Sequence, residues 1–170
     1  MKRKHKKFSR PRKPFDAERI KSENEIVKKY GLKNKREIWK AKAKLDIIRK
    51  QAKKTIHLDE EKQKKFLGKL AKMGLKTENV VDVLAFTEED ILKRRLQSII
   101  VKGGLATTPK GARQSIVHKH VLIKGDVVNI PSYWVNTSEE SSIKLNIKHK
   151  KAKPAGEINE VQKHQEAIKV

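Results

Sequence analysis

The stretch from Thr108 to Val128, TPKGARQSIVHKHVLIKGDVV, constrains the fold of this chain more than any other. Thr108 is a suitable N-cap, and Pro109 can follow it as the first helical residue because its φ is already helical and it has no N–H to leave unpaired. Two runs of β-branched residues then flank Lys124-Gly125-Asp126, and glycine supplies the positive φ that a tight hairpin turn needs. The pattern predicts a helix followed by a β-hairpin.

The segment TEEDILKRRLQSII, residues 87–100, predicts one continuous helix before this module. Thr87 is a suitable N-cap, and Asp90 lies three residues later, where a negative charge suits the positive end of the helix dipole. The apolar residues recur with helical spacing, which leaves Arg94 and Arg95 at the edges of a buried stripe. A strand at 143–147 can pair with the hairpin. We therefore expect two helices and a short antiparallel sheet over residues 87–147.

Residues 15–86 predict a mainly helical region. A first helix should end at Tyr30, because Gly31 tolerates the positive φ of a helix C-cap. Asn34 and Glu37 resemble a capping box that opens a second helix. The second helix has one apolar stripe, and its members are Ile38, Ala41, Leu45, Ile48 and Ala52.

The charge of the chain is strongly positive. It has 43 Lys and Arg against 20 Asp and Glu, a net charge of +23. Residues 1–58 hold 22 basic and 6 acidic residues, or +16 of that total, and residues 1–14 form a basic arm without any acid. Such a surplus indicates a polyanionic partner, with nucleic acid as the leading candidate. An anionic membrane is disfavoured because only 5% of the residues are aromatic.

Several kinds of site are not expected. The chain has no cysteine, which excludes disulfides, thiol catalysis and a zinc ribbon. His118 and His120 lie two residues apart, but no third metal ligand accompanies them. No Walker-type phosphate loop is present, and Ser115 has no positioned base. We expect no enzymatic activity, no metal, no cofactor and no small-molecule substrate.

Two stretches resemble a known family. Residues 90–135, DILKRRLQSIIVKGGLATTPKGARQSIVHKHVLIKGDVVNIPSYWV, follow the S-four RNA-binding domain in its R-L pair, glycine turn, A-R-x-x-I, H-x-H, glycine hairpin and P-S close. Residues 28–50, KKYGLKNKREIWKAKAKLDIIRK, look like the N-terminal helical region of the S-four family of small-subunit ribosomal proteins, in its archaeal and eukaryotic form. The resemblance implies an α+β fold in which a mainly helical region precedes a small α-L domain, in which two helices pack on a short bent antiparallel sheet.

The resemblance also implies a function. It implies binding to the five-prime domain of small-subunit rRNA at a helix junction, a role in subunit assembly, and a cytoplasmic, ribosomal location near the channel through which mRNA enters. Partners would be rRNA, neighbouring small-subunit proteins and mRNA, with no membrane. It divides the chain into a basic arm (1–14), a helical rRNA-binding region (15–86), the S-four domain (87–147) and a basic, mixed tail (148–170).

The expected RNA-binding residues follow from the same resemblance and from the charge surplus. Carried over by position, the domain would contribute Arg94, Arg95, Lys110, Arg113, Gln114, His118, His120 and Lys124. The arm and the helical region would add Arg10, Arg12, Lys33, Asn34, Lys35, Arg36, Lys40, Lys44, Arg49 and Lys50.

Two departures and three alternatives accompany the resemblance. Lys119 stands where the family often has glycine, at a cost of roughly 1–2 kcal/mol if that residue is left-handed, and the hairpin has Lys124-Gly125 where the family often has Asn-Gly. The chain also lacks the cysteines with which some members bind zinc. An RNA-modifying enzyme would need a catalytic domain for which 170 residues leave no room. A non-ribosomal RNA-binding factor is disfavoured by the match over residues 28–50. Charge alone also permits DNA binding.

Overall fold

The structure is a computed structural model, and it describes residues 7–146 of the chain. The predicted tail at 148–170 and the first six residues of the predicted arm lie outside the described residues. The helices are α1 Ala17–Tyr30, α2 Arg36–Thr55, α3 Glu60–Lys72, the 3₁₀ helix η1 Asp82–Ala85, α4 Glu88–Lys93, α5 Leu96–Lys102, α6 Pro109–Val117 and α7 Thr137–Glu140. None of these helices combines the length and the apolar character that a membrane crossing requires.

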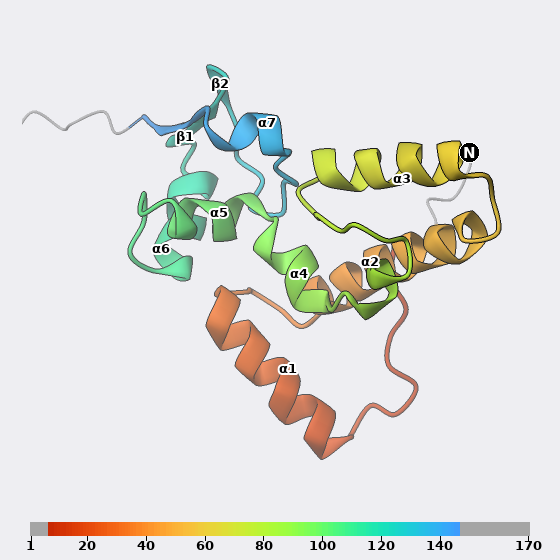
Figure 1. Cartoon of the computed structure of the whole chain (residues 1–170). Helices are drawn as coiled ribbons and strands as arrows, with labels where there is room; N and C mark the ends of the chain where they lie inside the picture. The colour runs from red at the N-terminus through yellow and green to blue at the C-terminus, as the bar shows by residue number, and fades with distance from the viewer. Residues whose placement is uncertain (1–6, 147–170) are drawn as a thin grey trace, which may run out of the picture.

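A three-stranded antiparallel sheet completes the fold. Its strands are β1 Val121–Ile123, β2 Asp126–Val127 and β3 Ile143–Leu145, in the order β2-β1-β3. The turn between β1 and β2 is made by Lys124 and Gly125, both with positive φ, as a two-residue hairpin of the I′ type requires. The sheet lies beside α5 and α6 at one end of the molecule (Figure 1). The predicted α+β class and the hairpin are confirmed.

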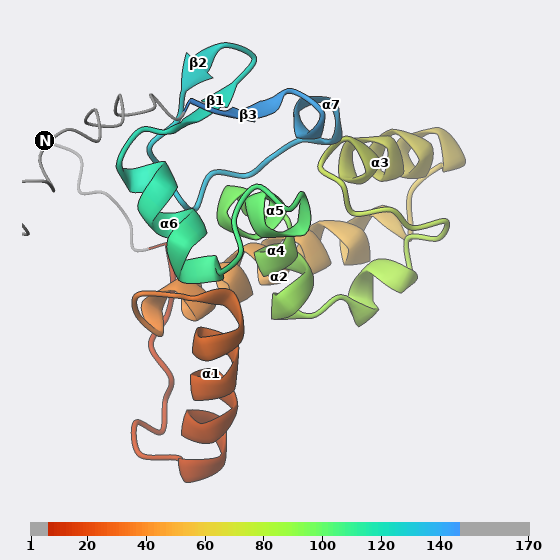
Figure 2. The ribbon, with the colours of Figure 1, turned by 90° about the vertical axis from the view of Figure 1, so that its left-hand side faces the viewer.

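The first helix stands against the N-terminus of α6 (Figure 2). Gly31 ends α1 with φ +58°, and a Cβ built on it would lie 2.8 Å from the Cβ of Pro109. The buried side chain of Gln97 connects the two segments. Its amide nitrogen donates hydrogen bonds to the carbonyl oxygen of Tyr30 at 3.0 Å and to that of Pro109 at 2.8 Å. The junction therefore needs glycine at position 31 for both conformation and space.

The buried apolar residues form two clusters. The first joins α2 to α3, η1 and α4, and it contains the whole predicted stripe of α2 together with Ile91 and Leu92. The second begins at Leu96 and fills the space between α5, α6 and the sheet. The chain passes from one cluster to the other at Arg94 and Arg95.

The continuous helix predicted for residues 87–100 is wrong. The capping box of Thr87 and Asp90 is present, but α4 ends at Lys93 and Arg95 is extended, with φ −76° and ψ 146°. The cause is a short backbone pairing with the segment around Trp134, in which the Leu96 N–H donates to the Tyr133 oxygen at 2.9 Å. Arg94 and Arg95 are consequently not at the exposed edges of a helix.

Candidate nucleic-acid interface

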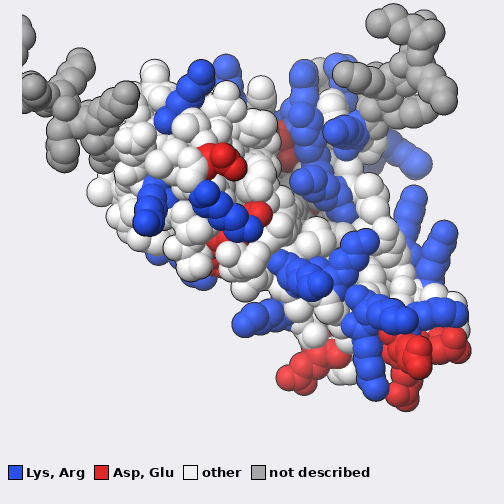
Figure 3. Space-filling model, turned by 90° about the horizontal axis from the view of Figure 1, so that it is seen from above, with Lys and Arg blue, Asp and Glu red and all other residues white. Residues whose placement is uncertain are grey.

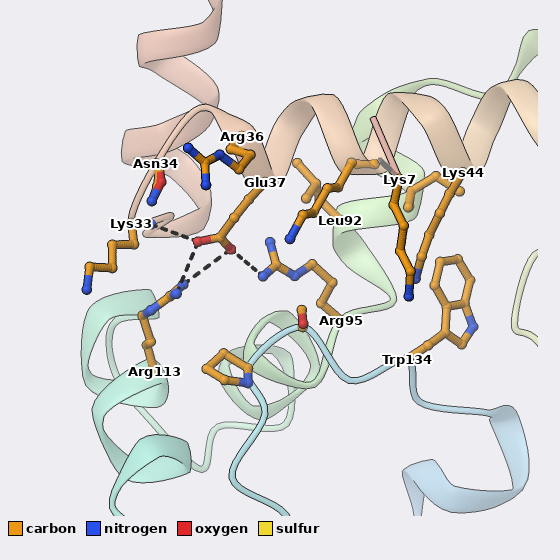
Figure 4. A pocket seen from close by; sticks show the side chains of 15 residues that line it. Lys7, Lys33, Asn34, Arg36, Glu37, Lys44, Leu92, Arg95, Arg113 and Trp134 are labelled. Carbon is orange, nitrogen blue, oxygen red and sulfur yellow. Dashed lines mark hydrogen bonds and ion pairs between the residues drawn. The ribbon is translucent and has the colours of Figure 1, made fainter. Parts of the chain in front are cut away.

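A strongly basic depression lies between α2 and the α-L domain, and we call it the basic cleft (Figure 4). Its volume is about 470 Å³. Among the described residues that line it, Glu37 is the only acidic one. Seven cations line it, and they are Lys7, Lys33, Arg36, Lys40, Lys44, Arg95 and Arg113. Seven positive charges against one negative charge make this the kind of surface that binds phosphates.

Glu37 joins α2 to the α-L domain at the centre of the basic cleft. Its Oε1 lies 3.0 Å from Nη2 of Arg113 on α6, and its Oε2 accepts a hydrogen bond from Nη2 of Arg95. Oε1 also accepts the backbone N–H of Lys33 at 3.2 Å. Figure 4 shows the two guanidinium groups converging on this carboxylate. One side chain thus ties the loop before α2 to two elements about 60 and 76 residues away.

The predicted capping box at Asn34 and Glu37 is wrong. The N-cap position of α2 is Lys35, and no side chain caps it. Glu37 accepts the N–H of Lys33 rather than that of Asn34, and it also accepts hydrogen bonds from two arginines, which are about twice as strong as those from a neutral N–H. Sequence spacing alone could not reveal these distant partners.

The charge state of Glu37 follows from its surroundings. Burial raises its pKa, but hydrogen bonds from Arg95 and Arg113 and the positive charges of both groups lower it, and the net pKa is below the ordinary 4.5. Glu37 is therefore ionised at neutral pH.

The pKa of Lys44 is lowered by partial burial and by the neighbouring charges of Arg95 and Lys7. The cations of the basic cleft repel one another, and a bound phosphate would relieve that repulsion.

Lys44 and Trp134 form one wall of the basic cleft. The Nζ of Lys44 lies 5.1 Å from the centroid of the Trp134 ring, a cation–π geometry. Trp134 Nε1–H donates to the carbonyl oxygen of Met73 at 3.0 Å, which attaches the segment before α7 to the end of α3. The described part of the arm reaches the same wall, where Lys7 lies beside Lys44 (Figure 4), and the ring centroids of Phe8 and Trp39 are 6.1 Å apart.

Seven of the expected RNA-binding residues lie in the basic cleft: Lys33, Asn34, Arg36, Lys40, Lys44, Arg95 and Arg113. Arg95 has only 8% of its side chain exposed, so its guanidinium is committed to Glu37. Lys7, Glu37 and Trp134 were missed as site residues. The run of eight Lys and Arg in residues 1–14 pointed to the arm as a whole but not to Lys7.

Three other expected residues are engaged within the chain. Arg94 pairs with Glu140 at 3.1 Å and donates to the Val135 oxygen. Arg49 donates to the Phe86 oxygen at 2.6 Å, and Lys35 lies 3.5 Å from Glu23. These contacts connect distant parts of the chain, so Arg94, Arg49 and Lys35 each have a structural role within the fold.

The remaining expected residues are exposed and do not line the basic cleft. They are Arg10, Arg12, Lys50, Lys110, Gln114, His118, His120 and Lys124. The rings of His118 and His120 are stacked with centroids 6.2 Å apart. Among residues 7–146 no group of three His, Cys, Asp or Glu is arranged to hold a metal ion. Seen from above, Lys and Arg are denser over the helical region than over the half that carries the sheet (Figure 3).

Comparison with known proteins agrees with this architecture. The family model of the S4 domain matches residues 94–141. The chain is 44% identical over 149 residues to the small ribosomal subunit protein uS4 of Saccharolobus islandicus, which covers 84% of this chain and 82% of that protein. It is 42% identical over 144 residues to the uS4 protein of Methanothermobacter thermautotrophicus, covering 81% and 84%.

A third relative shows the same coverage. The uS4 protein of Nanoarchaeum equitans is 42% identical over 154 residues, or 84% of each chain. These matches include both the helical region and the α-L domain in the same order, and the resemblance drawn from the sequence is confirmed. The chain belongs to the uS4 family of small ribosomal subunit proteins.

Proposed function

We propose that this protein is a structural constituent of the small ribosomal subunit and binds small-subunit rRNA through the basic cleft. The single observation that carries the proposal is the lining of that cleft, in which cations from α2, α6 and the α4–α5 junction surround one internal carboxylate. Membership of the uS4 family supports the ribosomal assignment. The protein acts by binding and positioning RNA, without catalysis.

The proposed mechanism is electrostatic and geometric. Lys and Arg displace counterions from the RNA backbone, so that affinity falls steeply as salt increases. The cleft reads the shape of the RNA, because the deep, narrow major groove of A-form RNA hides the base edges. Glu37 holds α2 and α6 at one mutual angle, and RNA segments bound on either side of the cleft are held at that angle too.

The finer assignment rests on the family. We propose that the bound RNA is the helix junction in the five-prime domain of small-subunit rRNA, that the protein acts early in subunit assembly in the cytoplasm, and that it lies near the channel through which mRNA enters. The described part of the arm, the helical region 15–86 and the domain 87–147 would all contribute to binding. Neighbouring small-subunit proteins would be the other partners.

A salt series with matched variants tests the proposal. The double variant Arg36→Ala, Lys40→Ala removes two exposed cations of the basic cleft, and Lys53→Ala, Lys54→Ala removes two exposed cations of the same helix outside it. Each variant is titrated against five-prime-domain rRNA, with an unrelated structured RNA and duplex DNA as competitors. We expect the cleft variant to lose about tenfold in affinity and to show a shallower salt slope, since fewer counterions are released.

The control variant separates the cleft from general charge. An equal loss in the two variants would mean that any two cations serve, and the basic cleft would not be the binding site. Equal competition by duplex DNA would contradict specificity for RNA. Tight binding that survives both competitors and depends on Arg36 and Lys40 supports the proposed function.

A further inference from the structure

A second depression, which we call the apolar groove, lies between α2 and α3 and has a volume of about 430 Å³. Ile48 and Leu70, both in the first core cluster, form part of it. Its other apolar members are Ile47, Phe66, Met73 and Trp134. Ile47 is 57% exposed, whereas its neighbour Ile48 is 7% exposed. The groove is therefore an apolar surface that the core of the described chain leaves open to solvent.

The polar residues of the apolar groove restrict what can fill it. They are the cations Lys44 and Lys69 and the amides of Gln51 and Asn136, and no acidic residue within 7–146 lines the groove. Two cations favour an anionic ligand, and two amides can hydrogen-bond a planar polar edge. Phe66 and Trp134 both line the groove, and aromatic side chains favour a flat ligand. An unpaired nucleobase with its attached phosphate combines all of these properties.

The apolar groove is also continuous with the basic cleft. Lys44 and Trp134 line both depressions, so they form the wall between them. An RNA strand whose phosphates lie in the basic cleft would need to cross only this wall to place a base in the groove. The Trp134 indole is held in place by its hydrogen bond to Met73, which lies in the groove itself.

We propose that the apolar groove binds one unpaired nucleobase of the RNA whose backbone lies in the basic cleft. This inference rests on the proposed function and adds a base-binding site to a surface otherwise described only by its charge. Phe66 and Trp134 flank the base, Asn136 and Gln51 accept and donate hydrogen bonds at its edge, and Lys44 and Lys69 neutralise the adjoining phosphates.

Exposed residues allow a test that does not disturb folding. Ile47→Asn makes the groove polar, and Val81→Asn is its matched control, because Val81 is 60% exposed and lines neither depression. Neither substitution changes the charge. We expect Ile47→Asn to weaken binding of five-prime-domain rRNA by about fivefold to tenfold, in line with the loss of one stacked base, and Val81→Asn to leave it within about twofold.

A second measurement observes the base directly. The chain has two methionines, Met1 and Met73, so a ¹³C-methyl spectrum is assigned with one Met73→Leu sample. Adenosine and uridine monophosphates should shift the Met73 methyl signal through the ring current of the base, and ribose 5-phosphate should not. Adding rRNA should shift the same signal.

The outcomes separate this inference from the proposed function. If rRNA binds tightly but Met73 does not shift and Ile47→Asn binds like the unsubstituted protein, the base site is wrong and the groove is left for a protein partner. If the unsubstituted protein does not bind rRNA at all, both the proposed function and the base site are wrong. A Met73 shift together with a selective loss in Ile47→Asn supports the inference.

Discussion

Glu37 on α2 and Arg113 on α6 meet across the boundary of the two core clusters, with Oε1 of the carboxylate 3.0 Å from Nη2 of the guanidinium. Arg95 approaches the same carboxylate from the break between α4 and α5. These three side chains fix the angle between the helical region and the α-L domain, which is the geometry that the proposed function requires.

Glu37→Gln should destabilise the protein. The amide keeps the shape of the side chain but leaves Arg95, which is buried, without a counter-charge. We expect the free energy of unfolding to fall by about 2 kcal/mol, less than the 3–5 kcal/mol typical of a fully buried pair because Arg113 is partly exposed. Urea unfolding measures it, and Glu61→Gln, an exposed change of the same kind on α3, should have almost no effect. Equal effects of the two substitutions would contradict the role of Glu37.

The stability of the protein should fall in acid in a way that depends on Glu37. Because its folded pKa lies below 4.5, the carboxylate contributes stability above that pH and loses the contribution as the pH falls through the folded pKa. A protonated Glu37 resembles glutamine. The difference in unfolding free energy between the unsubstituted protein and Glu37→Gln should therefore shrink as the pH falls below the ordinary value of 4.5 and through the lower folded pKa. A difference that stays constant would mean that the ionised form of Glu37 is not what stabilises the fold.

Gly31→Ala should be costly, and Gly68→Ala should not. At position 31 the added Cβ would meet Pro109 at 2.8 Å in a backbone with φ +58°, and we expect a loss of about 2–3 kcal/mol. At position 68, inside α3, nothing lies within 4 Å of the added Cβ, and alanine should stabilise the helix by about 0.5–1 kcal/mol. Thermal or urea unfolding of both variants checks the pair. A Gly31→Ala variant as stable as the unsubstituted protein would show that α1 does not depend on its contact with α6.

Lys119→Gly should change stability and RNA affinity in opposite directions. Lys119 is left-handed, with φ +63°, between the exposed His118 and His120. Glycine removes backbone strain of about 1 kcal/mol and also removes one cation. Lys119→Ala removes the cation but keeps the strain. We expect equal losses of rRNA affinity in the two variants and a higher unfolding free energy only in the glycine variant. Unchanged affinity in both would show that Lys119 lies outside the RNA contact.

Local patterns in the sequence predicted local structure well. The caps at Gly31, Thr87 and Thr108, the apolar stripe of α2 and the Lys124–Gly125 turn are each determined by residues within a few positions of one another. The break at Arg95 could not be predicted in this way. The apolar spacing continues through it, and its cause is a backbone pairing with Trp134, which lies 39 residues further along the chain (134 − 95).

The candidate site was likewise predicted from the sequence only in part. Charge counts identified α2 as a basic surface, and the resemblance pointed to Arg95 and Arg113 in the domain. The sequence could not show that Glu37 unites them, since a glutamate three residues after an asparagine fits a capping box equally well. The sequence also could not show which arginines form hydrogen bonds within the protein. Arg94 and Arg49 were predicted to bind RNA, but in the fold they donate to backbone oxygens of distant segments.

The break between α4 and α5 bears on how the protein unfolds. Ile91 and Leu92 belong to the cluster of the helical region, while Leu96, four residues after Leu92, belongs to that of the α-L domain. A cut between Leu92 and Leu96 would expose apolar side chains of the two clusters. It would also separate Arg95 from its partner Glu37 or leave one of them without the other. The two cores are therefore expected to lose their structure in a single cooperative transition, even though each has its own set of packed residues.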